Sequence, residues 1–192
     1  ASPDSSQRDA LQRLDHLAYQ LTLRKAWGGG RKSLFRRQSW ERPERGLYLW
    51  GGVGRGKTFL MDLFADSLPE GTAIRLHFHR FMNKVHERLK ELQGNENPLE
   101  MVADELAHRG KVLCLDECFV SDITDAMVLG SVFDALFRRG MALVTTSNIE
   151  PRNLYEGGLQ RDRFMPAISL IEKHCEIFNL DSGTNYRLRT LK

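Results

Sequence analysis

One segment constrains the fold more than any other: Gly51-Gly52-Val53-Gly54-Arg55-Gly56-Lys57-Thr58. It matches the pattern G-x-x-x-x-G-K-[ST], in which glycines let the backbone curl so that successive N–H groups face a phosphate. An apolar run at 47–50 precedes it, and a helical pattern at about 57–67 follows it. A strand, a glycine-rich turn and a helix N-terminus in this order bind anions. We therefore expect an α/β fold with a phosphate-binding loop.

The residue types of this loop predict a site for ATP or ADP with Mg²⁺. Lys57 supplies a positive charge to the β and γ phosphate oxygens, and the Thr58 hydroxyl is a ligand for Mg²⁺. The residues expected to contact the nucleotide are Gly51, Gly52, Val53, Gly54, Arg55, Gly56, Lys57, Thr58 and Phe59.

From Gly46 onward, short apolar runs alternate with helical periods, which is typical of a parallel sheet covered by helices. The expected strands are 47–50, 74–79, 112–115, 141–146 and 175–180, and the expected helices are 57–67, 82–92, 98–108, 123–138 and 159–174. A further helix over 6–24, with Ser6 as its N-cap, precedes them. The second strand alternates apolar and polar side chains, which predicts an edge strand.

Two acidic residues end the third expected strand. Asp116 is predicted to lie beside the Mg²⁺, and Glu117 to polarise an attacking water molecule. Asn148 follows the next strand and is expected at the same sheet edge, where its amide can hold that water against Glu117. Together these residues favour ATP hydrolysis over phosphate transfer to a small molecule, which needs no second carboxylate.

Two histidines, His77 and His79, are expected on one face of the second strand. Because no Asp, Glu or Cys lies near them in the sequence, hydrogen bonding is favoured over metal binding.

Composition indicates a globular cytoplasmic protein. Hydrophobic residues make up 41% of the 192 residues and charged residues 28%. No apolar run approaches the roughly 20 residues that a membrane span needs, and the first residues lack the layout of a signal peptide. Three cysteines without a CxxC pair argue against a disulfide framework or a zinc site.

Beyond these motifs, the chain resembles the AAA+ ATPases, and among them the AFG/LACE-type branch, which includes a bacterial cell-division ATPase. The resemblance rests on the phosphate loop, the acid pair, the strand end at 145–148 and the following segments: Gly46-Leu47-Tyr48-Leu49-Trp50, His77-Phe78-His79-Arg80-Phe81-Met82, Phe119-Val120-Ser121-Asp122-Ile123-Thr124-Asp125-Ala126-Met127, Gly158-Leu159-Gln160-Arg161-Asp162-Arg163-Phe164 and Tyr186-Arg187-Leu188-Arg189-Thr190-Leu191. It covers nearly the whole chain after Arg45, and more loosely the first helix.

The resemblance implies a P-loop NTPase of AAA+ type with a parallel five-stranded sheet of order 5-1-4-3-2 and ATP hydrolysis. It also implies remodelling of a protein partner, with FtsZ at the bacterial division ring as the candidate. By the same resemblance, Arg161 and Arg163 stand where a neighbouring subunit receives an arginine finger, and Gln7 is a candidate reader of the adenine edge.

AAA+ proteins carry a helical lid after the fifth strand, and here only twelve residues follow Leu180. We therefore expect a fragment without its lid, organised as an N-terminal helix and basic arm at 1–45 and a nucleotide-binding domain at 46–192. Such a fragment is expected to be mainly monomeric with low activity, whereas the full-length protein is expected to form a homo-oligomer.

Charge distribution bears on a second class of function, a helicase-loader or initiator-like ATPase acting on nucleic acid. Residues 1–46 carry ten basic and five acidic side chains, whereas the remaining 146 residues carry 18 and 20. The basic arm at 31–45 is short and the remaining body is net negative without a basic stripe, so nucleic acid is the less favoured partner. A third class, a nucleotide-switch adaptor with little turnover, conflicts with an intact Glu117 and Asn148 pair.

Overall fold

The computed structural model describes residues 5–28 and 44–181. Its elements, in chain order, are α1 (Ser5–Gly28), β1 (Gly46–Trp50), α2 (Lys57–Ser67), β2 (Ala73–His77), α3 (Phe78–Glu91), α4 (Pro98–Arg109), β3 (Val112–Asp116), α5 (Ile123–Arg138), β4 (Ala142–Ser147), the 3₁₀ turn η1 (Pro151–Asn153), α6 (Arg161–His174) and β5 (Cys175–Asn179).

The five strands form one sheet of order β2-β3-β4-β1-β5, and every neighbouring pair is parallel. Read from the other edge, this is the expected order 5-1-4-3-2, and β2 lies at the predicted edge. Because all strands run in one direction, their carboxyl ends share one edge of the sheet. The loops after β1, β3, β4 and β5 therefore lie close together.

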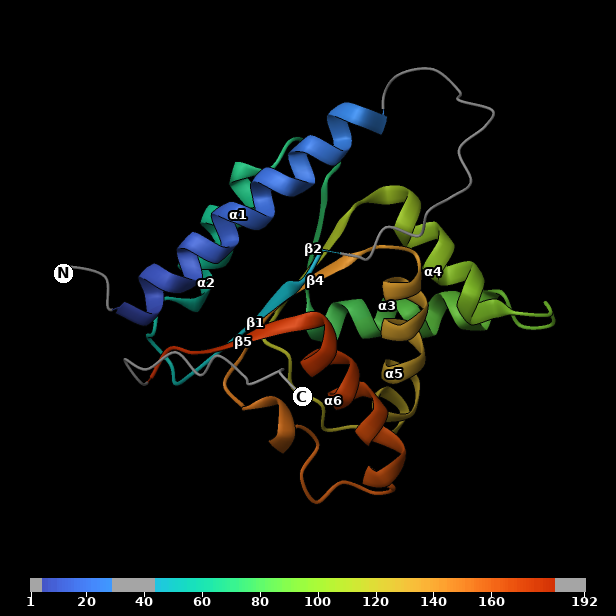
Figure 1. The fold of residues 1–192 in the computed structure, drawn as a ribbon. Coiled ribbons are helices and arrows are strands. Elements are labelled where there is room, and N and C mark those ends of the chain that lie inside the picture. The colour runs from blue at the N-terminus through green and yellow to red at the C-terminus, as the bar shows by residue number, and fades with distance from the viewer. Residues whose placement is uncertain (1–4, 29–43, 182–192) are drawn as a thin grey trace, which may run out of the picture.

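Two layers of helices cover the sheet (Figure 1). Helices α1 and α2 pack on one face, where leucines of both helices meet Leu47 and Leu49 of β1. Helices α3, α4, α5 and α6 cover the other face and enclose Tyr48, Leu113 and Leu115. Apolar cover on both faces explains why the central strands are continuous apolar runs in the sequence.

The second strand ends earlier than expected. β2 stops at His77 and α3 begins at Phe78, so the predicted strand to His79 and the predicted helix start at Met82 are wrong. The His77 imidazole caps α3 by accepting a hydrogen bond from the backbone N–H of His79. Buried Phe78, Phe81, Met82 and Val85 follow helical spacing, which outweighs the short alternating pattern.

α1 ends at Gly28, four residues beyond the expected end at 24, and the other boundaries differ by at most two residues. Ser6 lies inside α1 and is buried, so it is not the N-cap, and the last helix begins at Arg161 rather than Leu159. Residues 31–43 of the predicted basic arm at 31–45 lie outside the described residues, and the proposed division at residue 45 stays a prediction. Over the described ranges, no helix has the length and apolar character to cross a membrane.

Candidate functional site

The loop between β1 and α2 has the backbone that its glycines predict. Gly54 and Gly56 adopt φ angles of 80° and 79°, in the left-handed region where a side chain is disfavoured. Gly56 is the residue before α2, and the helix begins at Lys57. Thr58 and Phe59, on the first turn of α2, are exposed. A strand, a glycine loop and a helix N-terminus therefore stand in the order that binds phosphate.

The Lys57 ammonium group folds over this loop. Its Nζ donates hydrogen bonds to the carbonyl oxygens of Gly51 at 2.5 Å and Gly52 at 2.7 Å. Burial lowers the pKa of Lys57, while the negative charges of Asp181 and Glu117 act in the opposite direction. An ammonium group has three donors, so one N–H remains for a phosphate oxygen.

A carboxylate already lies against the loop. The backbone N–H of Gly52 donates to both oxygens of Asp181, at 3.0 and 2.9 Å, and Arg55 Nε pairs with Asp181 Oδ1 at 2.8 Å. Sequence reasoning missed Asp181. Its signal was its place two residues after the end of β5, because β5 pairs with β1 and the Trp50–Asn179 register brings the two strand ends together.

Gln7 of α1 lies beside the same loop, where its Nε2 donates to the carbonyl oxygen of Arg55 at 2.8 Å. The structure thus places the predicted adenine reader next to the phosphate loop, although the two are 48 residues apart in the chain.

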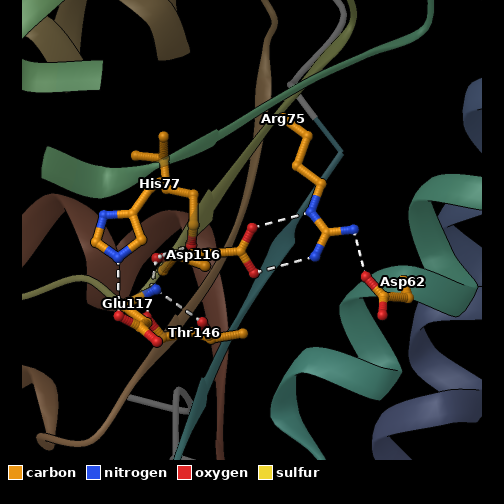
Figure 2. Close-up of polar contacts among 8 residues, drawn as sticks. Asp62, Arg75, His77, Asp116, Glu117 and Thr146 are labelled. Carbon is orange, nitrogen blue, oxygen red and sulfur yellow. Dashed lines mark hydrogen bonds and ion pairs between the residues drawn. The ribbon is translucent and has the colours of Figure 1, made fainter. Parts of the chain in front are cut away.

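The acid pair stands at the end of β3. Asp116 is the last residue of the strand, and Glu117 follows with φ at 55°. The Glu117 N–H donates to Thr146 Oγ1 at 3.0 Å, and its exposed carboxylate meets His77 Nε2 at 2.8 Å (Figure 2). A left-handed conformation at a non-glycine residue persists only where its surroundings hold it.

The loop after the acid pair is anchored to the end of β4. The N–H of Cys118 donates to the Thr146 carbonyl at 2.7 Å, and Ser147 Oγ donates to the Cys118 carbonyl at 2.7 Å. Burial raises the pKa of the Cys118 thiol to about 12, so the thiol stays protonated at neutral pH. These bonds fix the backbone from which Glu117 projects.

Asn148 and Glu117 line one cleft of about 700 Å³, together with His77 and Phe119. Asn148 directly follows β4 and is exposed. The Ser147 carbonyl beside it accepts a hydrogen bond from the N–H of Gly51 at 3.2 Å. The predicted water-binding residues are therefore brought together, next to the start of the phosphate loop.

The carboxylate of Asp116 is held by Arg75 of β2 (Figure 2). Arg75 Nε donates to Asp116 Oδ2 at 2.9 Å, and one terminal nitrogen donates to Oδ1 at 3.3 Å. The hydrogen bond with Asp116 is the largest cause that raises the pKa of Arg75 above its ordinary value, so the guanidinium stays charged.

Sequence reasoning missed the roles of Arg75 and His77. The expected edge strand put both on its polar face, but their partners follow from the pairing of β2 with β3, which sets His77 opposite Asp116. His79 lies on α3, so the expected pair of histidines on one strand face is wrong.

Arg161 and Arg163 lie away from the cleft that holds Glu117, on the first turn of α6. The Arg161 guanidinium donates to the backbone carbonyls of Arg152 at 2.5 Å and Leu154 at 3.2 Å. Arg163 is exposed and donates to Gln160 Oε1 at 2.9 Å. Within one subunit, neither arginine meets the phosphate loop.

Within residues 5–28 and 44–181, no group of three or more His, Cys, Asp or Glu side chains is arranged to hold a metal ion. Mg²⁺ is commonly bound by one or two carboxylates together with substrate phosphates and water, so it needs no such cage. The oxygen atoms of Thr58 and Asp116 have the chemistry that Mg²⁺ prefers.

Comparisons with known proteins agree with this arrangement. The chain is 51% identical to the cell division protein ZapE of Escherichia coli K12, over 98% of this chain and 53% of that protein. It is 40% identical to the lactation elevated protein 1 homolog B of Danio rerio, over 78% of this chain and 32% of that protein. The chain thus spans about half the length of the bacterial relative and about a third of the length of the fish protein.

Among solved structures, a putative primosome component from Streptococcus pyogenes serotype M3 has the same fold, with a TM-score of 0.61 and 20% identity over 97% of this chain and 85% of that chain. This likeness agrees with the expected fold, a parallel five-stranded sheet flanked by helices. The family model for AFG1-like ATPases matches residues 1–192. The chain therefore belongs to the AFG1-like ATPase family.

Proposed function

We propose that this chain binds ATP or ADP with Mg²⁺ at the carboxyl edge of its sheet and hydrolyses ATP. The observation that carries the proposal is the meeting at this edge of the phosphate loop, the Asp116 and Glu117 pair and Asn148. The family membership and the relatives' similarity support it.

Each residue has a role that follows from its chemistry. The loop N–H groups and Lys57 would hold the phosphates, and Thr58 and Asp116 would hold Mg²⁺, whose charge would offset that of the phosphate oxygens. Glu117 accepts a proton from the attacking water, and Asn148 orients that water in the shared cleft. The hydrogen bond from His77 keeps the Glu117 carboxylate at the cleft.

Calorimetry of the chain with ADP, in Mg²⁺ and in EDTA, tests the binding step, and phosphate release from ATP tests hydrolysis. We expect saturable binding that Mg²⁺ strengthens. The absence of any nucleotide binding would overturn the proposal.

Asp181 occupies the loop where a phosphate is expected to bind, so the two anions compete. Replacing Asp181 by asparagine is expected to tighten ADP binding up to about fivefold, because a half-exposed ion pair contributes about 1 kcal/mol or less. Titration calorimetry measures the change. Asp181→Glu, which keeps the charge, is the matched control, and weaker binding by the asparagine variant would show that Asp181 acts in the bound state instead.

We further propose that the full-length protein is a homo-oligomer that couples hydrolysis to remodelling of a protein partner, with FtsZ as the candidate, in the bacterial cytoplasm. The similarity to a cell division protein supports this choice. Pull-down with the full-length Glu117→Gln variant in ATP tests it, and failure to retain FtsZ argues against that partner.

A salt titration of DNA binding tests the nucleic-acid alternative, for which the basic arm is the only argument.

Arg163 is the better candidate for a finger, because the Arg161 guanidinium is engaged by backbone carbonyls. We expect full-length Lys57→Ala, which keeps its arginines, to restore hydrolysis when mixed with full-length Arg163→Ala, because each supplies what the other lacks. Phosphate release measures recovery. Arg161→Ala is the comparison, and no recovery in mixed oligomers confirmed by mass would assign Arg163 a structural role.

A further inference from the structure

Arg75 joins two carboxylates that come from different elements (Figure 2). Its guanidinium forks the Asp116 carboxylate at 2.9 and 3.3 Å, and its third contact reaches Asp62 Oδ1 of α2 at 2.5 Å. The Arg75 side chain is 31% exposed and that of Asp116 only 19%. The cluster is therefore a partly buried tie between β2, β3 and α2.

Asp62, the partner of Arg75 on α2, lies on the same helix as Thr58, one of the proposed Mg²⁺ ligands. Asp62 stands four residues after Thr58, so the two side chains lie on the same face of α2, about one turn apart. Asp116 ends β3. Arg75 thus connects the helix that carries one proposed Mg²⁺ ligand with the strand end that carries the other.

We propose that Arg75 is a positioning residue for Mg²⁺, which holds the Asp116 carboxylate in register with the start of α2. This inference rests on the proposed function. A carboxylate has about four lone-pair sites, and the fork uses two, so others remain for Mg²⁺ or its water. Partners that orient metal ligands in this way typically change metal affinity about 10- to 100-fold when removed.

If Arg75 acted only through its positive charge, its removal would have the opposite effect on the Mg²⁺ requirement. If Arg75 only repelled Mg²⁺, its removal would lower the Mg²⁺ concentration needed, and removal of the Asp62 charge would raise it. If Arg75 positions Asp116, removal of Arg75 and removal of the Asp62 charge both raise the Mg²⁺ concentration needed, because each breaks the hydrogen-bonded link between α2 and Asp116. The sign of the Arg75 effect therefore separates the two.

The experiment measures ADP affinity by calorimetry across a Mg²⁺ titration and in EDTA, for Arg75→Ala, Arg75→Lys and Asp62→Asn. We expect Arg75→Ala to raise the half-saturating Mg²⁺ concentration about 10- to 100-fold with unchanged affinity in EDTA. In Arg75→Lys the half-saturating Mg²⁺ concentration is expected to stay raised, because an ammonium cannot make the planar fork. In Asp62→Asn the half-saturating Mg²⁺ concentration is also expected to rise, by a smaller factor.

Arg88 offers a matched control, because it forks Glu105 and also bonds Glu91 on the surface of α3 and α4. Arg88→Ala is expected to leave the Mg²⁺ requirement unchanged.

An unchanged or lower requirement in Arg75→Ala would overturn the inference, as would an equal loss of affinity with and without Mg²⁺. Thermal unfolding reports on folding. If Arg75→Ala does not fold, Arg75→Lys decides the question, because charge alone predicts an unchanged Mg²⁺ requirement in this variant and the positioning role predicts a raised one. A wild-type chain that binds no ADP would instead contradict the proposed function.

Discussion

Replacing Lys57 by alanine is expected to weaken ADP or ATP binding about 100-fold. A hydrogen bond to a charged group contributes up to about 3 kcal/mol, and each 1.4 kcal/mol corresponds to about tenfold in affinity. The Lys57 ammonium is also the partly buried cation that lies directly over the loop. Titration calorimetry of the variant and the wild type measures the loss.

Lys84→Ala is the matched control, because Lys84 is an exposed lysine on α3 whose loss is expected to leave nucleotide affinity unchanged. Thermal unfolding should accompany both variants, since Lys57 also bonds the loop carbonyls. Unchanged affinity in a folded Lys57→Ala variant would mean that this loop is not the phosphate site.

Replacing Glu117 by glutamine is expected to slow ATP hydrolysis about 10²- to 10⁴-fold while nucleotide affinity is kept, because glutamine preserves the shape and removes the base. An amide can also keep the hydrogen bond with His77 and the same backbone conformation. Phosphate release measured in the full-length protein, alongside calorimetry, separates the two effects.

Asn148→Ala is expected to change hydrolysis in the same direction and less completely, since the water keeps its base. Glu87→Gln, at an exposed site on α3, is the control and should hydrolyse at the wild-type rate. If Glu117→Gln also hydrolyses at that rate, Glu117 does not activate the water and the nucleotide-switch alternative gains support.

The sequence by itself determined the local parts of the site. A glycine pattern followed by Lys57 specifies its own turn and helix start, because the backbone angles and the donors lie within a few consecutive residues. The two acids after an apolar strand are local in the same way. The sheet order also followed from the sequence, although through the family resemblance rather than from residue spacing.

The second strand marks the limit of local reasoning. Alternation correctly placed β2 at the edge, yet the helical period that begins at Phe78 overlaps the alternating pattern. Over so few residues the sequence fits both the two-residue period of a strand and the helical period. Burial of Phe78, Phe81 and Met82 in the core favours the helix.

Only the tertiary structure decided which side chains meet across the sheet edge. Arg75 and Asp116 are 41 residues apart in the chain, His77 and Glu117 are 40 apart, and Gly52 and Asp181 are 129 apart. Each contact depends on strand order and register, and shifting a strand by one residue would turn each side chain to the other face. The sequence therefore determined the chemistry of the loop and the acid pair, whereas the fold determined which charges hold them in place.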